Sequence, residues 1–97
     1  MKIVNGFAVR EVAGKSVAIA VGGKATALGG MIALNEAGKM LFSLLMEGTT
    51  EEKMIAALVE AYEIEERIAE KDVAAFLAPL REANLIENES MGKEVET

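Results

Sequence analysis

Residues 31–45 constrain the fold more than any other stretch, because a short apolar run passes into an amphipathic helical pattern at a single residue. Asn35 stands at that point, and its side-chain oxygen can accept hydrogen bonds from the free N–H groups of a first helical turn. Glu36 follows where the helix dipole favours an anion. We therefore expect strands before Asn35 and helices after it. The expected buried face of the first helix consists of Ala37, Met40, Leu41, Leu44 and Leu45.

Three segments are expected to be strands. In Phe7–Val12 and Ser16–Val21, apolar residues alternate with smaller or polar ones at period 2. Gly14, in the short turn between them, is free to take a positive φ. Met31–Leu34 is expected to form the third strand, and the glycine-rich segment 22–30 before it a loop.

Two more helices are expected after the first. Gly48 is predicted to cap the first helix in the left-handed conformation, and Thr49 or Thr50 to begin the second. Asn84 can close the third helix, which we expect over residues 65–83. The predicted inward residues of the second helix are Met54, Ile55, Leu58, Val59 and Tyr62, and those of the third are Ile68, Ala69, Val73, Phe76, Leu77 and Leu80.

The length of 97 residues allows one domain, which we expect to span residues 1–86. Residues 87–97 are acidic and nearly free of large apolar groups, so a disordered tail is predicted there. No apolar run reaches the roughly 20 residues that span a bilayer, so we expect a cytoplasmic protein without membrane contact. The net charge of −6 disfavours nucleic acid as a partner.

The residue types disfavour catalysis and metal binding. The chain has no cysteine and no histidine, so the usual ligands of zinc, haem and iron–sulfur clusters are missing. Its serines have no histidine to activate them as nucleophiles. We therefore expect no catalytic residue, no metal and no cofactor, and a function based on binding.

One feature favours a binding function directly. The stretch Ala25–Asn35 carries no charge, and it contains the third strand, which is expected at the edge of a small sheet. Edge strands are usually guarded by lysine, proline or a bulge, because their unpaired N–H and C=O groups recruit other strands. Either this chain covers the strand itself or a partner peptide adds to it, and both alternatives stay open at this point.

Four blocks of the sequence resemble the PqqD family. They are Gly-Met-Ile-Ala-Leu-Asn-Glu-Ala-Gly at 30–38, Glu-Gly-Thr-Thr-Glu-Glu at 47–52, Asp-Val-Ala-Ala-Phe-Leu at 72–77 and Leu-Arg-Glu-Ala-Asn-Leu-Ile at 80–86. Their order and spacing extend the resemblance over residues 3–86.

The resemblance implies an α+β domain of winged helix-turn-helix type, with a three-stranded antiparallel sheet followed by three helices, called a RiPP recognition element. Such domains bind the leader of a ribosomally synthesised precursor peptide as an added strand and present it to a radical-SAM or other modifying enzyme. Pyrroloquinoline quinone itself is not implied. The implied peptide-binding residues are Met31, Ile32, Ala33 and Leu34 on the strand, and Asp72, Val73, Phe76, Leu77 and Leu80 on the third helix.

Two other functions are weighed against peptide binding. A winged helix-turn-helix regulator would bind DNA, but residues 65–82 carry five acidic and three basic side chains, the wrong balance for a phosphate-lined groove. Alternatively, the open edge serves self-association and gives a homodimer.

Overall fold

The computed structural model describes residues 1–22 and 31–87. Its elements in chain order are β1 (Lys2–Ile3), β2 (Phe7–Val12), β3 (Lys15–Ala20), β4 (Met31–Leu34), α1 (Glu36–Glu47), α2 (Glu51–Tyr62), α3 (Glu66–Glu82) and β5 (Ile86–Glu87). A three-stranded antiparallel sheet, β2–β3–β4, precedes three helices, so the expected α+β fold is confirmed. The predictions for residues 23–30 and 88–97 lie outside the described residues. No helix in the described ranges is long and apolar enough to cross a membrane.

A tight hairpin begins the main sheet. β2 and β3 pair as far as Val12 and Lys15, so only Ala13 and Gly14 form the turn. Both turn residues have a positive φ, 54° and 81°, a backbone twist that matches the twist of the two strands. Because the turn is this short, β3 begins and ends one residue earlier than the sequence pattern predicts.

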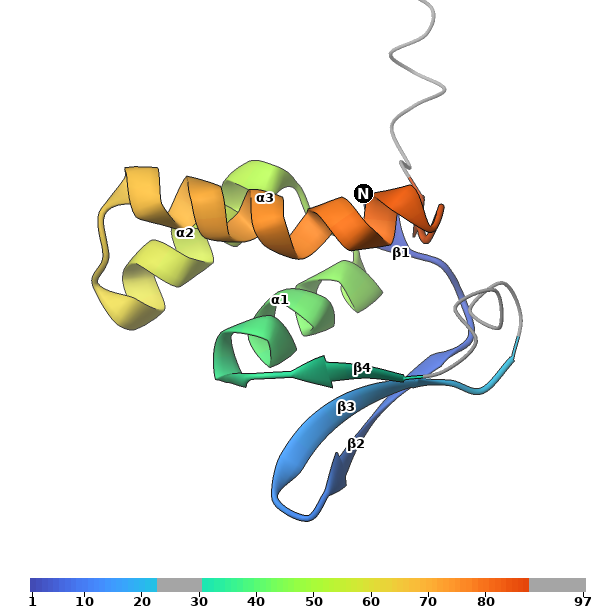
Figure 1. Ribbon diagram of the computed structural model, residues 1–97. Helices are drawn as coiled ribbons and strands as arrows, with labels where there is room; N and C mark the ends of the chain where they lie inside the picture. Colours follow the sequence, from blue (N-terminus) through green and yellow to red (C-terminus); the bar gives the residue numbers. More distant parts are fainter. Residues whose placement is uncertain (23–30, 88–97) are drawn as a thin grey trace, which may run out of the picture.

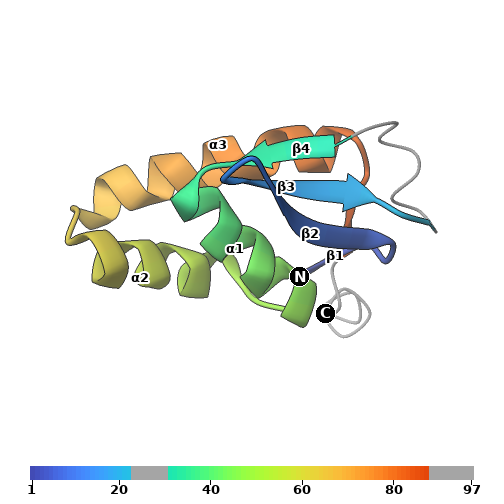
Figure 2. The ribbon, with the colours of Figure 1, turned by 90° about the horizontal axis from the view of Figure 1, so that it is seen from below.

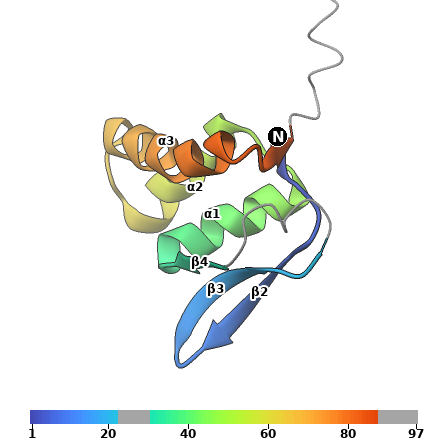
Figure 3. The same cartoon turned by 45° about the vertical axis from the view of Figure 1, so that its right-hand side comes forward.

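Helix α1 lies between the sheet on one side and α2 and α3 on the other (Figures 1 and 3). Its Phe42 is completely buried and meets the Phe7 ring edge-on, with ring centroids 5.4 Å apart. Phe42 was not among the predicted inward residues, whereas Met40 and Leu44, which were, are only half-buried. A helix covered by two layers buries a broader stripe than its main apolar spacing indicates.

Two of the predicted inward residues on the other helices are exposed. Tyr62 is 41% exposed because it is the last residue of α2. Ile68 is 43% exposed because the buried stripe of α3 runs through Ala69, Val73 and Leu77, and Ile68 is rotated about 100° away from Ala69.

The two ends of the described chain form a second, two-stranded sheet that the sequence pattern did not predict. β1 and β5 are antiparallel, and the N–H of Val4 donates to the carbonyl of Leu85 at 2.8 Å. Asn84 has a positive φ of 60°, as predicted, and turns the chain so that Leu85 enters the core. Glu87 was expected in the tail but belongs to β5, where it pairs with Lys2.

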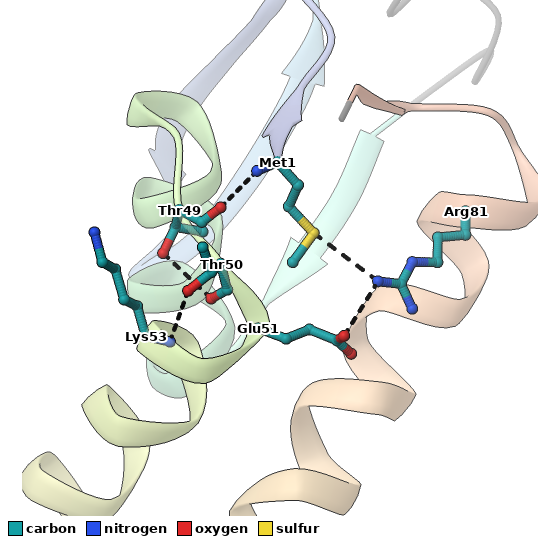
Figure 4. A network of polar contacts seen from close by, with 6 residues as sticks. All are labelled: Met1, Thr49, Thr50, Glu51, Lys53 and Arg81. Carbon is teal, nitrogen blue, oxygen red and sulfur yellow. Dashed lines mark hydrogen bonds and ion pairs between the residues drawn. The ribbon is translucent and has the colours of Figure 1, made fainter. Parts of the chain in front are cut away.

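Polar contacts hold the first residue to the helical layer (Figure 4). Met1 and Thr49 exchange two backbone hydrogen bonds, which join the start of the chain to the segment between α1 and α2. The guanidinium of Arg81 on α3 lies 3.7 Å from the Glu51 carboxylate at the start of α2, and 4.0 Å from Sδ of Met1. Met1, directly before β1, thus contacts both the segment between α1 and α2 and, through Arg81, helix α3.

Of the caps predicted around the first two helices, Thr50 is found as expected and Gly48 is not. The Thr50 hydroxyl oxygen accepts from the N–H of Lys53 at 3.1 Å, as expected for an N-cap. Gly48 has a positive φ of 103°, but its ψ of 127° is not left-handed helical, because the chain leaves α1 directly into an extended segment. Glu63 instead takes the left-handed conformation at the end of α2.

Phe42→Ala is expected to lower the free energy of unfolding by about 3–5 kcal/mol, since it empties a fully buried aromatic site beside Phe7. The matched control is Met46→Ala on the same helix, where the side chain is 38% exposed and the loss should stay within about 0.5 kcal/mol. Urea unfolding followed by circular dichroism measures both. Equal losses in the two variants would contradict the assigned core.

Candidate functional site

Strand β4 is the edge of the main sheet (Figure 2). Within residues 1–22 and 31–87 it pairs with β3 alone, from Ile19↔Met31 to Ser16↔Leu34. In an antiparallel ladder every second residue directs its N–H and C=O groups away from the paired strand. β4 therefore presents hydrogen-bonding groups along its outer side, and the prediction that it is an edge strand is confirmed.

The four side chains of β4 divide between the two faces of the sheet. Met31 is 64% exposed and Ala33 is exposed, whereas Ile32 is half-buried and Leu34 is buried. This division follows from the period of two, since Ile32 lies opposite the buried Ala18 of β3. Ile32 and Leu34 thus face the helical layer, and Met31 and Ala33 face the other side.

A tight corner joins β4, α1 and α3. The side-chain oxygen Oδ1 of Asn35 accepts from the N–H of Gly38 at 2.7 Å, which confirms the predicted N-cap. A methyl group at Gly38 would lie 3.1 Å from that oxygen, 3.6 Å from Cε1 of Phe76 and 3.7 Å from Cδ2 of Leu34. Only the distance to Oδ1 of Asn35 is too short for an ordinary contact, so Gly38 leaves room for the cap, and Phe76 and Leu34 lie at van der Waals distance from the same place.

A hollow of about 400 Å³ opens beside this corner. Its walls come from all three helices, and the side chains that shape it are mostly small or apolar. They include Ala37 and Leu41 of α1, Leu58 of α2, and Asp72, Ala75 and Phe76 of α3. Among the described residues, Asp72 is the only charged one that lines it. The hollow can therefore receive a largely apolar group, with the Asp72 carboxylate at its rim.

The implied binding residues of α3 have two different placements. Asp72 is exposed and Phe76 half-buried, and both line the hollow. Val73, Leu77 and Leu80 are at most 4% exposed and belong to the core. Their side chains pack in the hydrophobic core and offer no surface of their own.

The sequence reasoning missed the contributions of α1 and α2 to the hollow, and one residue of α3. Ala75 lies three residues after Asp72, so helical spacing from the two implied residues Asp72 and Phe76 could have found it. Nothing in the sequence pattern distinguishes Ala37, Leu41 or Leu58 from ordinary core residues.

The other side of the Ala33–Asn35 segment faces a polar hollow of about 690 Å³. Two acidic and two basic side chains line it, and the ammonium of Lys39 lies 3.3 Å from the Glu11 carboxylate. Because both groups are largely exposed, this ion pair contributes little to stability. Across the described residues, no group of three or more acidic side chains is arranged to hold a metal ion.

The protein is a small α+β domain whose sheet has an open edge. A helix is capped where the edge strand ends, and a hollow lies beside this corner against a third helix. The family model described as Coenzyme PQQ synthesis protein D (PqqD) matches residues 11–86. The chain therefore belongs to the PqqD family, and the resemblance found in the sequence is confirmed.

A solved structure supports the same assignment. The chain of TbiB1, in complex with the TbiA(beta) leader peptide, is 25% identical to this chain with a TM-score of 0.70. The match covers 91% of this chain and 96% of the TbiB1 chain. No curated protein is significantly similar to this chain in sequence.

Asn35→Ala should lower the free energy of unfolding by about 1 kcal/mol, because the N–H of Gly38 loses its acceptor. Asn35→Asp keeps an acceptor at the same place and should unfold like the original protein. Urea titration measures both, and the ¹H–¹⁵N signal of Gly38 reports the cap locally. If the alanine variant is as stable as the aspartate variant, the cap does not hold this corner together.

Proposed function

We propose that this protein captures the leader segment of a ribosomally synthesised precursor peptide and presents it to a modifying enzyme, of radical-SAM or another type. The leader adds as a strand to the free edge of β4, and the protein itself carries out no chemistry. The observation that carries the proposal is the outer edge of Met31–Leu34, which no other strand of the described residues pairs, beside a hollow lined by Phe76, in a member of the PqqD family. The proposed place of action is the cytoplasm.

The backbone of β4 supplies the first part of the binding. A strand docked at its edge lies about 4.8 Å away and bonds to every second residue of β4. Each such hydrogen bond contributes a net of about 0.5–1.5 kcal/mol. These bonds do not depend on the leader's side chains, so they provide affinity without selecting a sequence.

Side-chain contacts at the hollow supply the selection. In a docked strand, alternate side chains point to the same side as Ile32 and Leu34, which is the side of α1 and α3. An aliphatic or aromatic leader residue on that side can enter the hollow and contact Phe76. Asp72 at the rim favours a basic neighbour in the leader over an acidic one.

The absence of catalysis is part of the proposal. The sequence has no cysteine and no histidine, so the usual pairs of nucleophile and base cannot form. A peptide held along β4 keeps its distal residues free, which is what a separate modifying enzyme requires. Binding and chemistry are thus divided between two proteins.

Phe76→Ala should weaken leader binding on the order of tenfold, because the leader residue in the hollow loses an aromatic contact. The probe is a fluorescently labelled synthetic leader peptide of a candidate precursor, and fluorescence anisotropy measures its dissociation constant. Tyr62→Ala is the matched control, since Tyr62 is an exposed aromatic residue that does not line the hollow.

The two affinities and a light-scattering measurement separate binding in the hollow, binding elsewhere and self-association. Weaker binding only in the Phe76 variant supports the groove. Equal affinities of both variants would place the peptide elsewhere and overturn the proposal. Light scattering on the same samples reports whether the free protein is a dimer through β4, in which case the leader should dissociate it.

A further inference from the structure

A second hollow lies between α2 and α3, on the other side of the buried stripe of α3. It measures about 620 Å³, and its floor is formed by Ile55, Ala56 and Val59 of α2. Glu66 and Glu70 line it from α3. By helical rotation Glu66 and Glu70 lie about 80° and 120° from Phe76, across the buried stripe of α3, so the two hollows flank α3 on different sides.

The rim of this second hollow is acidic on both helices. Glu52 and Glu60 line it from α2, Glu66 and Glu70 line it from α3, and no lysine or arginine of residues 1–22 and 31–87 does so. In the described part of the chain, none of these four carboxylates forms an ion pair with a basic side chain. The nearby cation Arg67 pairs with a different carboxylate, that of Glu65.

Part of this arrangement is unfavourable for the protein alone. Glu52 and Glu66 lie in the first turns of α2 and α3, where the helix dipole favours a carboxylate. Glu70, however, lies four residues after Glu66 on the same helix, a spacing at which like charges destabilise the helix. The apolar floor between the two rows, with Ile55 and Val59 only half-buried, is also left in contact with water. Neither defect is relieved by a metal ion, since the described residues provide no group suited to hold one.

We infer that this second hollow, a groove with an apolar floor and an acidic rim, is the docking site for a basic amphipathic segment of the peptide-modifying enzyme. The choice of the modifying enzyme as partner rests on the proposed function, and the basic amphipathic character of the segment follows from the residues that line the hollow. An apolar side chain of the segment covers Ile55 and Val59, and lysine or arginine side chains on its two flanks face the two rows of carboxylates. A leader peptide at β4 and the enzyme at this groove can then bind together, with α3 as their common wall.

A charge-reversal pair tests the groove. Glu60→Lys/Glu70→Lys changes one carboxylate on each rim, whereas Glu47→Lys/Glu82→Lys changes two exposed carboxylates at the ends of α1 and α3 outside the hollow. Both double variants raise the net charge from −6 to −2, so any general effect of charge is the same in the two. Thermal unfolding verifies that both fold.

The first probe is a short synthetic amphipathic peptide of leucine and lysine, compared with a twin that has glutamate at every lysine position. In ¹H–¹⁵N spectra the lysine peptide should shift residues 52–70, and the twin should shift none. Glu60→Lys/Glu70→Lys should weaken binding of the lysine peptide by about tenfold or more, and the control pair much less. Equal weakening by both pairs, or shifts centred elsewhere, would overturn the inference.

The second probe is the purified candidate enzyme that modifies the precursor. The groove variant should lose affinity for this enzyme and keep its affinity for the leader, while the control pair keeps both. Unchanged enzyme affinity in the groove variant would reject the docking site. Failure of the proposed function looks different, because the leader would then leave the signals of Met31–Leu34 unmoved in every variant.

Discussion

The hydrogen bond from the N–H of Gly38 to Oδ1 of Asn35 is the constraint on which the candidate site depends. It requires β4 to stop and α1 to start within one residue, so the inner face of the strand and the first turn of the helix form one corner. A glycine at position 38 leaves room for Oδ1 of Asn35, and the Phe76 ring of α3 lies at van der Waals distance from the same corner. The edge strand, the capped helix and the third helix therefore meet at a single place, although the third helix is far from the other two in the sequence.

An unpaired edge next to an apolar hollow is normally a liability, because it invites pairing with any available strand. Here the described part of the edge, Met31–Leu34, carries no charge, while charges of both signs gather around the hairpin and α1 on one side. On α3 the charges are also divided. Asp72 alone borders the hollow near Phe76, and the carboxylates facing α2 lie on the other flank. The third helix thus separates two surfaces of different chemistry, which suits a protein with two partners.

Much of this fold could be predicted from local patterns. The hairpin, the strand at 31–34 and the caps at Asn35 and Thr50 have short-range signals, and the structure confirms them. β1 and β5 were missed because two-residue strands have no periodicity and pair only after the chain ends meet. Phe42 was missed because spacing predicts one helix face and does not reveal that α1 is covered from two sides.

The candidate site was predictable only in part, for a similar reason. The edge strand follows from the absence of charge over a short apolar stretch, and Phe76 and Asp72 follow from the family resemblance. Which residues of α3 reach the surface depends on the rotation of that helix, and this is set by contacts with distant elements. Val73 and Leu77 are consequently core residues, whereas Ala75, which was not among the implied binding residues, lines the hollow.

The most direct test of the account is deuterium exchange of the backbone amides of Met31–Leu34, resolved by NMR, with and without the precursor leader peptide. An added strand should slow exchange by about tenfold or more at every second residue, at those amides that point away from β3. The amides already bonded to β3 should change little. A bound leader that leaves all four amides exchanging at their original rates would contradict the claim that the edge of β4 receives it.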